Sequence, residues 1–119
     1  NLSRSTLTGA NLRGAYLTRA DLREAKLNEA NLRRSDLSQA NLTGADLRGA
    51  NLNRATLRGA NLREAILIGA SLMGANLSQA SLQGANLLEA VLTGANLTGV
   101  DLTGVDLSAT VMPNGSLSS

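Results

Sequence analysis

A leucine recurs at every fifth position of the chain, from Leu2 through Leu107. Met112 takes the next position of this series and Leu117 the one after it. A small residue, in most repeats Ala, stands two positions before each leucine. This repeat constrains the fold more than any other feature, because the backbone must return to the same conformation every five residues.

Neither a long helix nor a long strand can use this period. On an α-helix, at about 100° per residue, five residues advance the chain by about 500°, so successive leucines would form no stripe. On a strand, side chains alternate between the two faces, so leucines five apart would point in opposite directions. Ala and Leu are two apart, however, and share one side of a short extended segment. The period therefore predicts a solenoid with one short side per pentapeptide.

The last position of the repeat predicts a corner in the chain. Gly stands there in many repeats, including Gly9, Gly14 and Gly44, and Gly tolerates backbone dihedrals that other residues resist. Arg, Glu and Gln occupy the same position in other repeats. We therefore expect a corner that favours Gly without always requiring a positive φ.

The unit Ala-(Asn/Asp)-Leu-X-X, as in residues 10–14 and 45–49, resembles the pentapeptide repeat family over residues 1–112. The resemblance implies an all-β fold, a right-handed quadrilateral parallel β-helix of about six coils with four pentapeptides per coil. It also implies that the leucine and the small residue before it point inward. The residue directly before each leucine alternates in type between odd and even repeats, which fits an even number of sides.

The two ends of the repeat differ. We expect residues 1–112 to form the β-helix and residues 113–119 to form a C-terminal cap or tail. The inner small residue becomes Val100 and Val105 near this end, and Pro113-Asn114-Gly115 then supplies turn residues. The start of the chain has no similar feature, so we expect a further segment, another domain or a homodimer through the uncapped coil end to cover it.

The composition excludes several kinds of chemistry. The chain has no Cys and no His, which removes thiolate metal sites and the usual general base. The outward carboxylates are scattered and suggest no acid/base pair. We therefore expect no enzyme, no cofactor and no metal. No apolar run is long enough for a membrane helix, so we expect a soluble protein without a membrane partner, with the cytoplasm as the default compartment.

The charges are unevenly distributed along the chain. All eleven basic residues lie at or before Arg63, whereas four acidic residues and no basic residue follow it. Residues twenty apart should stack if a coil has four sides, which predicts a basic patch without acidic neighbours. A solvated surface is the main interpretation, and contact with phosphate is the alternative; the absence of aromatic platforms argues against nucleic acid. The predicted patch consists of Arg13, Arg33, Arg34 and Arg54.

A second surface is apolar where the repeat usually has polar residues. The same stacking argument places three of its residues on one side of the coil and two on the next. Such a cluster suggests a surface for a protein partner, and neutral drift at tolerant positions is the alternative. The predicted partner surface consists of Ile66, Ile68, Leu88, Met73 and Val91.

These features favour a non-enzymatic structural or protein–protein interaction module, a rigid β-helical rod with an unidentified protein partner. The resemblance suggests an alternative, because some members of the family imitate duplex DNA and protect DNA gyrase from quinolones. That role implies an acidic surface, which the first half of this chain does not have. A designed or excised scaffold with no partner of its own is a third interpretation.

Overall fold

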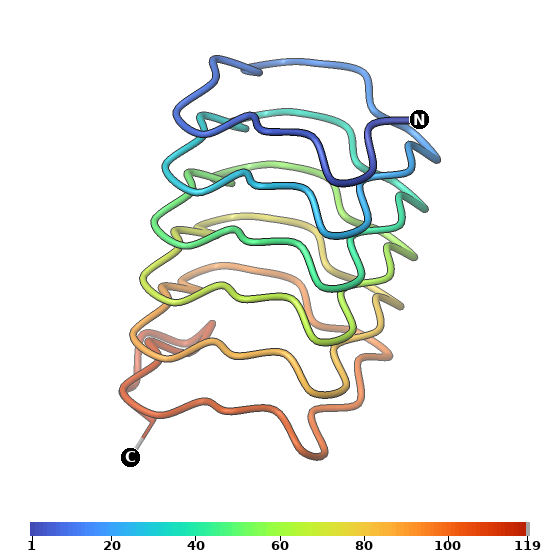
Figure 1. Ribbon diagram of the computed structural model, residues 1–119. Helices are drawn as coiled ribbons and strands as arrows, with labels where there is room; N and C mark the ends of the chain where they lie inside the picture. The colour runs from blue at the N-terminus through green and yellow to red at the C-terminus, as the bar shows by residue number, and fades with distance from the viewer. Residues whose placement is uncertain (119) are drawn as a thin grey trace.

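The computed structural model describes residues 1–118, and they form a stack of coils with the two ends of the chain at opposite ends of the stack (Figure 1). The molecule measures 35 × 23 × 21 Å along its principal axes. Within these residues, the chain forms neither a helix nor a strand longer than a single bridge. The structure is held together by isolated parallel β-bridges between neighbouring coils.

The parallel bridges join residues twenty positions apart. Thr6 pairs with Lys26, Lys26 with Asp46, and Asp46 with Ile66, and each residue in a parallel bridge stands directly before a leucine, or before Met112 in the case of Val111. Backbone hydrogen bonds flank each parallel bridge: around the bridge between Asn51 and Ser71, the Leu52 N–H donates to the Ser71 carbonyl at 2.7 Å and the Ser71 N–H donates to the Ala50 carbonyl at 3.0 Å. Twenty residues contain four pentapeptides, so one turn of the chain takes four repeats.

The leucines and the small residues fill the inside of the stack. Each leucine from Leu22 to Leu92 has at most 2% of its surface exposed, and the alanines among them are also buried. Ser35 and Thr110 occupy the small inner position and are buried as well. The prediction that both positions of the repeat point inward is confirmed for these coils.

The prediction that the corner does not always require a positive φ is wrong. Every residue at the last position of the repeat has a positive φ, from Arg4 (59°) to Ala109 (54°), whether or not it is Gly. The turn is closed by a hydrogen bond such as the one from the Ala55 N–H to the Leu52 carbonyl (3.0 Å). A positive φ at the third residue of such a turn is the requirement of type II geometry. The corner therefore always needs this conformation, and Arg, Glu and Gln adopt it at some cost in strain.

The Asn or Asp before the leucine has a structural role. The residue after each leucine has an N–H group that finds no carbonyl acceptor in the coil ladder. The side chain of Asn or Asp accepts this hydrogen bond, as Asn31 Oδ1 does from the Arg33 N–H (3.1 Å) and Asn76 Oδ1 from the Ser78 N–H (3.0 Å). Such Asx turns stabilise the corner locally, which explains the preference for these two residues at that position.

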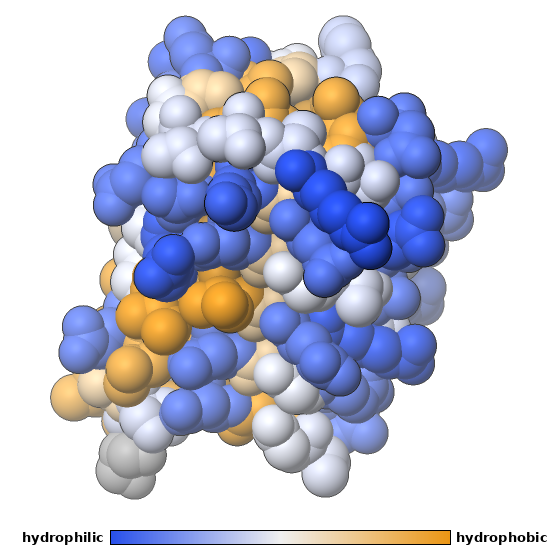
Figure 2. Space-filling model, in the orientation of Figure 1, coloured by the Kyte–Doolittle hydropathy of each residue, from blue (hydrophilic) through white to orange (hydrophobic). Residues whose placement is uncertain are grey.

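The first coil lies open at the end of the stack. Leu2 has 38% of its surface exposed, and Leu7, Leu12 and Leu17 are only partly buried. Figure 2 shows this end, at the top, with hydrophobic atoms at the surface. A leucine therefore needs a neighbouring coil on both sides to become fully buried.

The other end folds back on itself. Val111 forms an antiparallel bridge with Leu117, and the Ser118 N–H donates to the Thr110 carbonyl at 2.8 Å. The five-residue series seen in the sequence ends structurally at Met112, because Leu117 lies in this returning segment with 70% of its surface exposed. We expected residues 113–119 to form a cap or tail, and the structure describes this segment as far as residue 118, with Ser119 outside the described residues. That the segment acts as a cap stays a prediction.

The pentapeptide 100–104, near the C-terminal end, is separated from the coil before it. Within residues 1–118, neither the Leu82 N–H nor the Gly84 N–H donates a backbone hydrogen bond to residues 101–104. Val100 and Val105 flank this segment at the inner position that Ala occupies in most other repeats. A larger side chain needs more room inside the narrow coil, so we attribute the separation to Val100. The pentapeptide of Val105 stays joined to its coil, since the Asp106 carbonyl accepts the Leu87 N–H at 2.8 Å.

Candidate interaction surfaces

Two sides of the stack carry the residues that the sequence singles out. The first, which we call the arginine side, consists of the stacked pentapeptides 10–14, 30–34, 50–54, 70–74 and 90–94. The second, which we call the isoleucine side, consists of 25–29, 45–49, 65–69 and 85–89. The bridges Asn31 to Asn51 and Asp46 to Ile66 are examples of the stacking within each side.

Most arginines outside the arginine side form an ion pair or a hydrogen bond with another side chain. Arg23 forms an ion pair with Asp21 at 2.7 Å, and Arg48 forms one with Asp46 at 2.6 Å. The remaining pairs join residues twenty apart in neighbouring coils. They are Arg4 with Glu24, Arg19 with Gln39, and Arg63 with Gln83.

The four arginines of the arginine side have no such partners. The structure brings them together in two adjacent columns, with Arg13 and Arg33 in one and Arg34 and Arg54 in the other. None of their side chains donates a hydrogen bond to another side chain within residues 1–118. The pentapeptides of this side contain no acidic residue. Their positive charges are therefore not neutralised by neighbouring residues.

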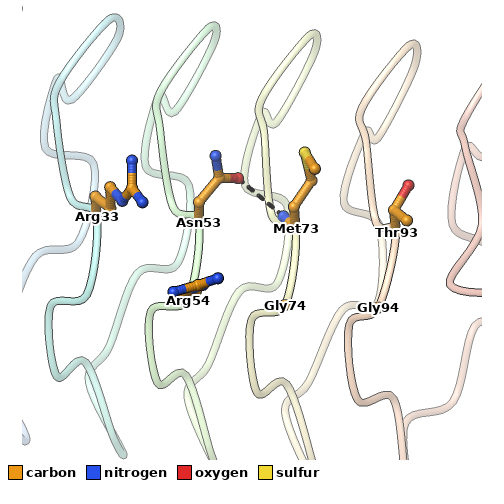
Figure 3. A pocket seen from close by; sticks show the side chains of 7 residues that line it. All are labelled: Arg33, Asn53, Arg54, Met73, Gly74, Thr93 and Gly94. Atoms are coloured by element: carbon orange, nitrogen blue, oxygen red, sulfur yellow. Dashed lines mark hydrogen bonds between the residues drawn. The ribbon is translucent and has the colours of Figure 1, made fainter.

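A hollow of about 280 Å³ lies at the C-terminal end of these columns. Figure 3 shows Arg33, Asn53, Met73 and Thr93 in one row across four coils, with Arg54 beside them. The Nε atom of Arg33 is buried and has no hydrogen-bond partner among the described residues. The hollow is lined by Arg33, Asn53, Arg54, Met73, Gly74, Thr93 and Gly94.

The sequence prediction missed part of this hollow. It identified the two arginines but not Asn53, Thr93, Gly74 or Gly94. The signal was present, because two glycines twenty residues apart remove the side chains that would otherwise cover the surface next to Arg54. A Cβ atom at Gly74 would lie 3.5 Å from Arg54 Cγ.

The predicted apolar surface is split between the two sides. Ile66, Ile68 and Leu88 lie on the isoleucine side, where the Gly69 N–H donates to the Leu88 carbonyl and holds the two coils together. These side chains are half-buried. Met73 and Val91 lie on the arginine side, and Met73 is the more exposed, at 45%. Figure 2 shows a hydrophobic area over the C-terminal half of the stack, next to hydrophilic side chains.

The apolar substitutions also remove turn caps. Ile66 and Val91 stand where most repeats have Asn or Asp, so they cannot accept the N–H of Ile68 or Thr93. Neither N–H finds another acceptor in residues 1–118. Sequence analysis also missed Val111, which is bridged to Val91 and extends the apolar column toward the end of the stack.

The carboxylates of the aspartates accept hydrogen bonds in the turns. The Arg23 side chain donates to Asp21 and lowers the pKa of that carboxyl to about 2, and Arg48 lowers the pKa of Asp46 in the same way. Hydrogen bonds from Ser38, Thr103 and Ser108 lower the pKa values of the other caps. Groups with lowered pKa are poor general acids or bases near neutral pH. No cluster of acidic residues that could hold a metal ion occurs in the described part of the chain.

The coil ladder, the buried leucine columns and the capped corners define a parallel β-solenoid whose sides present separate surfaces. Residues 1–39, 40–79 and 70–108 match the family described as pentapeptide repeats (8 copies). The chain belongs to the pentapeptide repeat family. Its members form right-handed β-helices and are in general structural modules without enzymatic activity.

Solved structures of pentapeptide repeat proteins are similar to this chain. Rfr23 from the cyanobacterium Cyanothece 51142 is 45% identical over 76% of this chain, with a TM-score of 0.73, and the match covers 60% of the Rfr23 chain. The protein alr5209 from Nostoc Pcc 7120 is 34% identical over 85% of this chain and 83% of its own, with a TM-score of 0.71. The chain thus spans less than two thirds of the length of Rfr23.

A more distant structure is that of QnrB1, a plasmid-mediated fluoroquinolone resistance protein. It is 21% identical over 96% of this chain and 72% of its own, with a TM-score of 0.48, and this similarity supports no statement about function. No curated protein matches the chain. Within residues 1–118, no helix has the length and apolar character needed to cross a membrane.

Proposed function

We propose that this protein is a non-enzymatic module that binds a protein partner through the apolar residues of its isoleucine side. The observation that carries the proposal is the replacement of polar residues by Ile66, Ile68 and Leu88 at outward positions of two adjacent coils. The side chains are half-buried by their own stack, so a partner would need to cover only their outer part.

The surroundings of these residues support an interface. The coil before them carries Asp46 and Arg48, and Glu89 lies at the corner after Leu88. An apolar centre with a polar rim is the common anatomy of protein interfaces. The uncapped N–H of Ile68 offers a donor within the apolar surface, which a partner carbonyl could accept.

The proposal can be tested by capturing partners from a lysate of the source cells and then measuring the binding of the captured protein in purified form. We expect the double variant Ile68→Asp/Leu88→Asp to lose this binding, because a buried carboxylate without a partner is strongly unfavourable. The matched control is Ser78→Asp/Thr98→Asp, which adds the same charges at the same repeat position of the same two coils on another side.

Two results would contradict the proposal. Equal binding by the parent and by the Ile68→Asp/Leu88→Asp variant would remove the isoleucine side as the interface. Turnover of a substrate that disappears on substitution of surface carboxylates would show that the protein is an enzyme. Circular dichroism melts of all variants separate lost binding from lost folding.

The finer architecture forms part of the proposal. We infer that the rod is quadrilateral in cross-section and contains about six coils over residues 1–112, as the twenty-residue register supports. A homodimer through the exposed first coil is a further possibility that this architecture offers, since Leu2 and its neighbours lie at an open coil end. Light scattering over a range of protein concentrations, on the parent and on Leu2→Asp/Leu7→Asp, tests the dimer.

Imitation of DNA has less support. That function needs a surface with regularly spaced negative charges, whereas the arginine side carries four unpaired guanidinium groups and no carboxylate. A gyrase supercoiling assay with and without a quinolone distinguishes the two functions, and we expect no protection.

A further inference from the structure

The hollow on the arginine side presents hydrogen-bond donors without any carboxylate. Arg33 lines the hollow, and its Nε, which the protein itself covers, has no hydrogen-bond partner among residues 1–118. The Oδ1 atom of Asn53 accepts from the Met73 N–H (2.9 Å) and from the Ser71 hydroxyl, so the amide NH₂ of Asn53 is the end that remains free to donate. Within residues 1–118 the Thr93 N–H has no acceptor, because Val91 replaces the usual turn cap. The chemical complement of this hollow is a group rich in acceptors.

The charge on this side points to an anion. Arg33 and Arg54 line the hollow, and Arg13 and Arg34 lie in the same two columns. Stacked coils are about 4.8 Å apart, so these like-charged side chains leave neighbouring backbone positions and repel one another. Most arginines elsewhere in the chain pair with another side chain, as Arg48 does with Asp46. A bound anion would supply here the negative charge that the sequence does not.

We propose that this hollow binds a phosphoryl group. A carboxylate offers two oxygens, which a single guanidinium fork can satisfy, whereas a phosphoryl group offers three and can accept from both columns together. Its charge at neutral pH, about −1.5 to −2, also matches the two arginines that line the hollow. The group belongs either to free phosphate or to a phosphorylated molecule, and the two sources share this chemistry.

The shape of the hollow fits such a group. Gly74 and Gly94 line the hollow without side chains, and a Cβ atom at Gly94 would lie 3.7 Å from the Gly74 nitrogen. Larger side chains at these two positions would fill the space beside Arg54. The volume of about 280 Å³ accommodates a phosphoryl group and leaves it open to solvent, where a carrier molecule could continue.

The experiment is a titration of the ¹⁵N-labelled protein followed by NMR. Inorganic phosphate and a phosphoserine tripeptide serve as probes, and acetate at matched ionic strength serves as the carboxylate control. We expect saturable shifts of the Gly74, Thr93 and Gly94 amides with the phosphoryl probes and no saturation with acetate. Saturation by the tripeptide alone would assign the site to a phosphorylated partner and still support the proposal.

Three variants test the residues. The double variant Arg33→Gln/Arg54→Gln should bind at least about tenfold more weakly, because it removes both charged donors. Arg58→Gln is the matched control, since Arg58 lines a hollow of similar size with Gln39 and Gln79 and also lacks a side-chain partner. Arg33→Lys keeps the charge but loses the planar fork, so intermediate affinity is expected.

The proposal is overturned if the shifts do not saturate, if acetate produces the same response, or if Arg58→Gln weakens binding as much as the double variant. Well-dispersed spectra of each variant establish that it is folded. The site does not depend on the proposed function, because Ile68→Asp/Leu88→Asp leaves all donors of the hollow in place. Failure of one proposal therefore leaves the other intact.

Discussion

The pentapeptide at 80–84 is well joined to the coil before it and poorly joined to the coil after it. The Leu62 N–H donates to the Ser81 carbonyl at 2.7 Å, and the Glu64 N–H donates to the Gln83 carbonyl at 3.0 Å. The equivalent bonds from Leu82 and Gly84 to residues 101–104 are missing from the described structure. The leucine is the same in both cases, so the leucine repeat alone does not hold coils together.

The difference lies at the small inner position. Ala60 and Ala80 precede the well-joined pentapeptides, whereas Val100 and Val105 flank the separated one. The corner survives there, since the Asp101 side chain still accepts the Thr103 N–H at 2.9 Å. Local turn formation and stacking are therefore separate contributions in this fold. A larger inner residue does not by itself prevent stacking, because the Asp106 carbonyl, in the pentapeptide of Val105, still accepts the Leu87 N–H at 2.8 Å, so we attribute the separation to Val100.

The largest expected effect on stability comes from truncating one leucine in the well-joined region and one in the separated pentapeptide. Leu62→Ala, in a fully buried position, should lower the free energy of unfolding by about 2 to 5 kcal/mol. Leu102→Ala should cost clearly less, because Leu102 is only partly buried. Urea melts of both variants measure the difference. Equal costs would mean that the last coil is as tightly packed as the middle.

A second substitution places a valine at the inner position of a well-joined pentapeptide. Ala60→Val places the larger side chain at a fully buried inner position and should destabilise the protein by about 1 to 3 kcal/mol. The matched control is Ala20→Val, because Ala20 stands at the same repeat position on the same side of the stack but is only partly buried. Equal thermal destabilisation by Ala60→Val and Ala20→Val would contradict the role given to Val100.

The reverse substitution should repair the separated pentapeptide. Hydrogen exchange in the parent should be faster at the amides of Leu82 and Gly84 than at those of Leu62 and Glu64, because the first two lack acceptors. In Val100→Ala/Val105→Ala we expect exchange at Leu82 to slow by roughly tenfold, which corresponds to about 1.4 kcal/mol of local stability. Unchanged exchange would assign the separation to another cause.

The smallest effect concerns pH and compares the caps Asp21 and Asp101 on this same side. The folded-state pKa of Asp21 is lowered to about 2 by Arg23, so its contribution is present above the ordinary pKa near 4 and is lost as the pH falls toward 2. Thr103 lowers the pKa of Asp101 through hydrogen bonds without an ion pair. The slope of Tm against pH between about 4 and 2 should therefore decrease more in Asp21→Asn than in Asp101→Asn. Asn keeps the turn cap in both variants, as Asn41 does naturally.

Much of the fold could be predicted from the sequence because one short unit repeats without interruption. The inward positions follow from the spacing of Ala and Leu alone. The obligatory positive φ was missed because Arg, Glu and Gln appeared to relax the need for Gly at the corner. The relevant signal was that no β-branched residue occurs at this position from Arg4 to Ala109, since Val, Ile and Thr are the residues that tolerate it least.

The sites were only partly predictable. The columns of Arg33 and Arg54 could be written out once the twenty-residue stacking was assumed. Whether a surface arginine is paired depends on rotamers and on neighbours in the next coil, which a list of columns does not contain. The orphaned Nε of Arg33 and the free amide of Asn53 became apparent only with the side chains in place.

The twenty-residue register also limits how such a chain can change in length. Deletion of twenty residues would remove one coil and leave every later side chain on the side where it started. Deletion of five residues between Arg54 and Gly74 would rotate everything that follows by one side, so Gly74 and Gly94 would no longer lie beyond Arg54. Whole coils are thus the unit in which this molecule can be shortened, lengthened or spliced while its binding surfaces stay in phase.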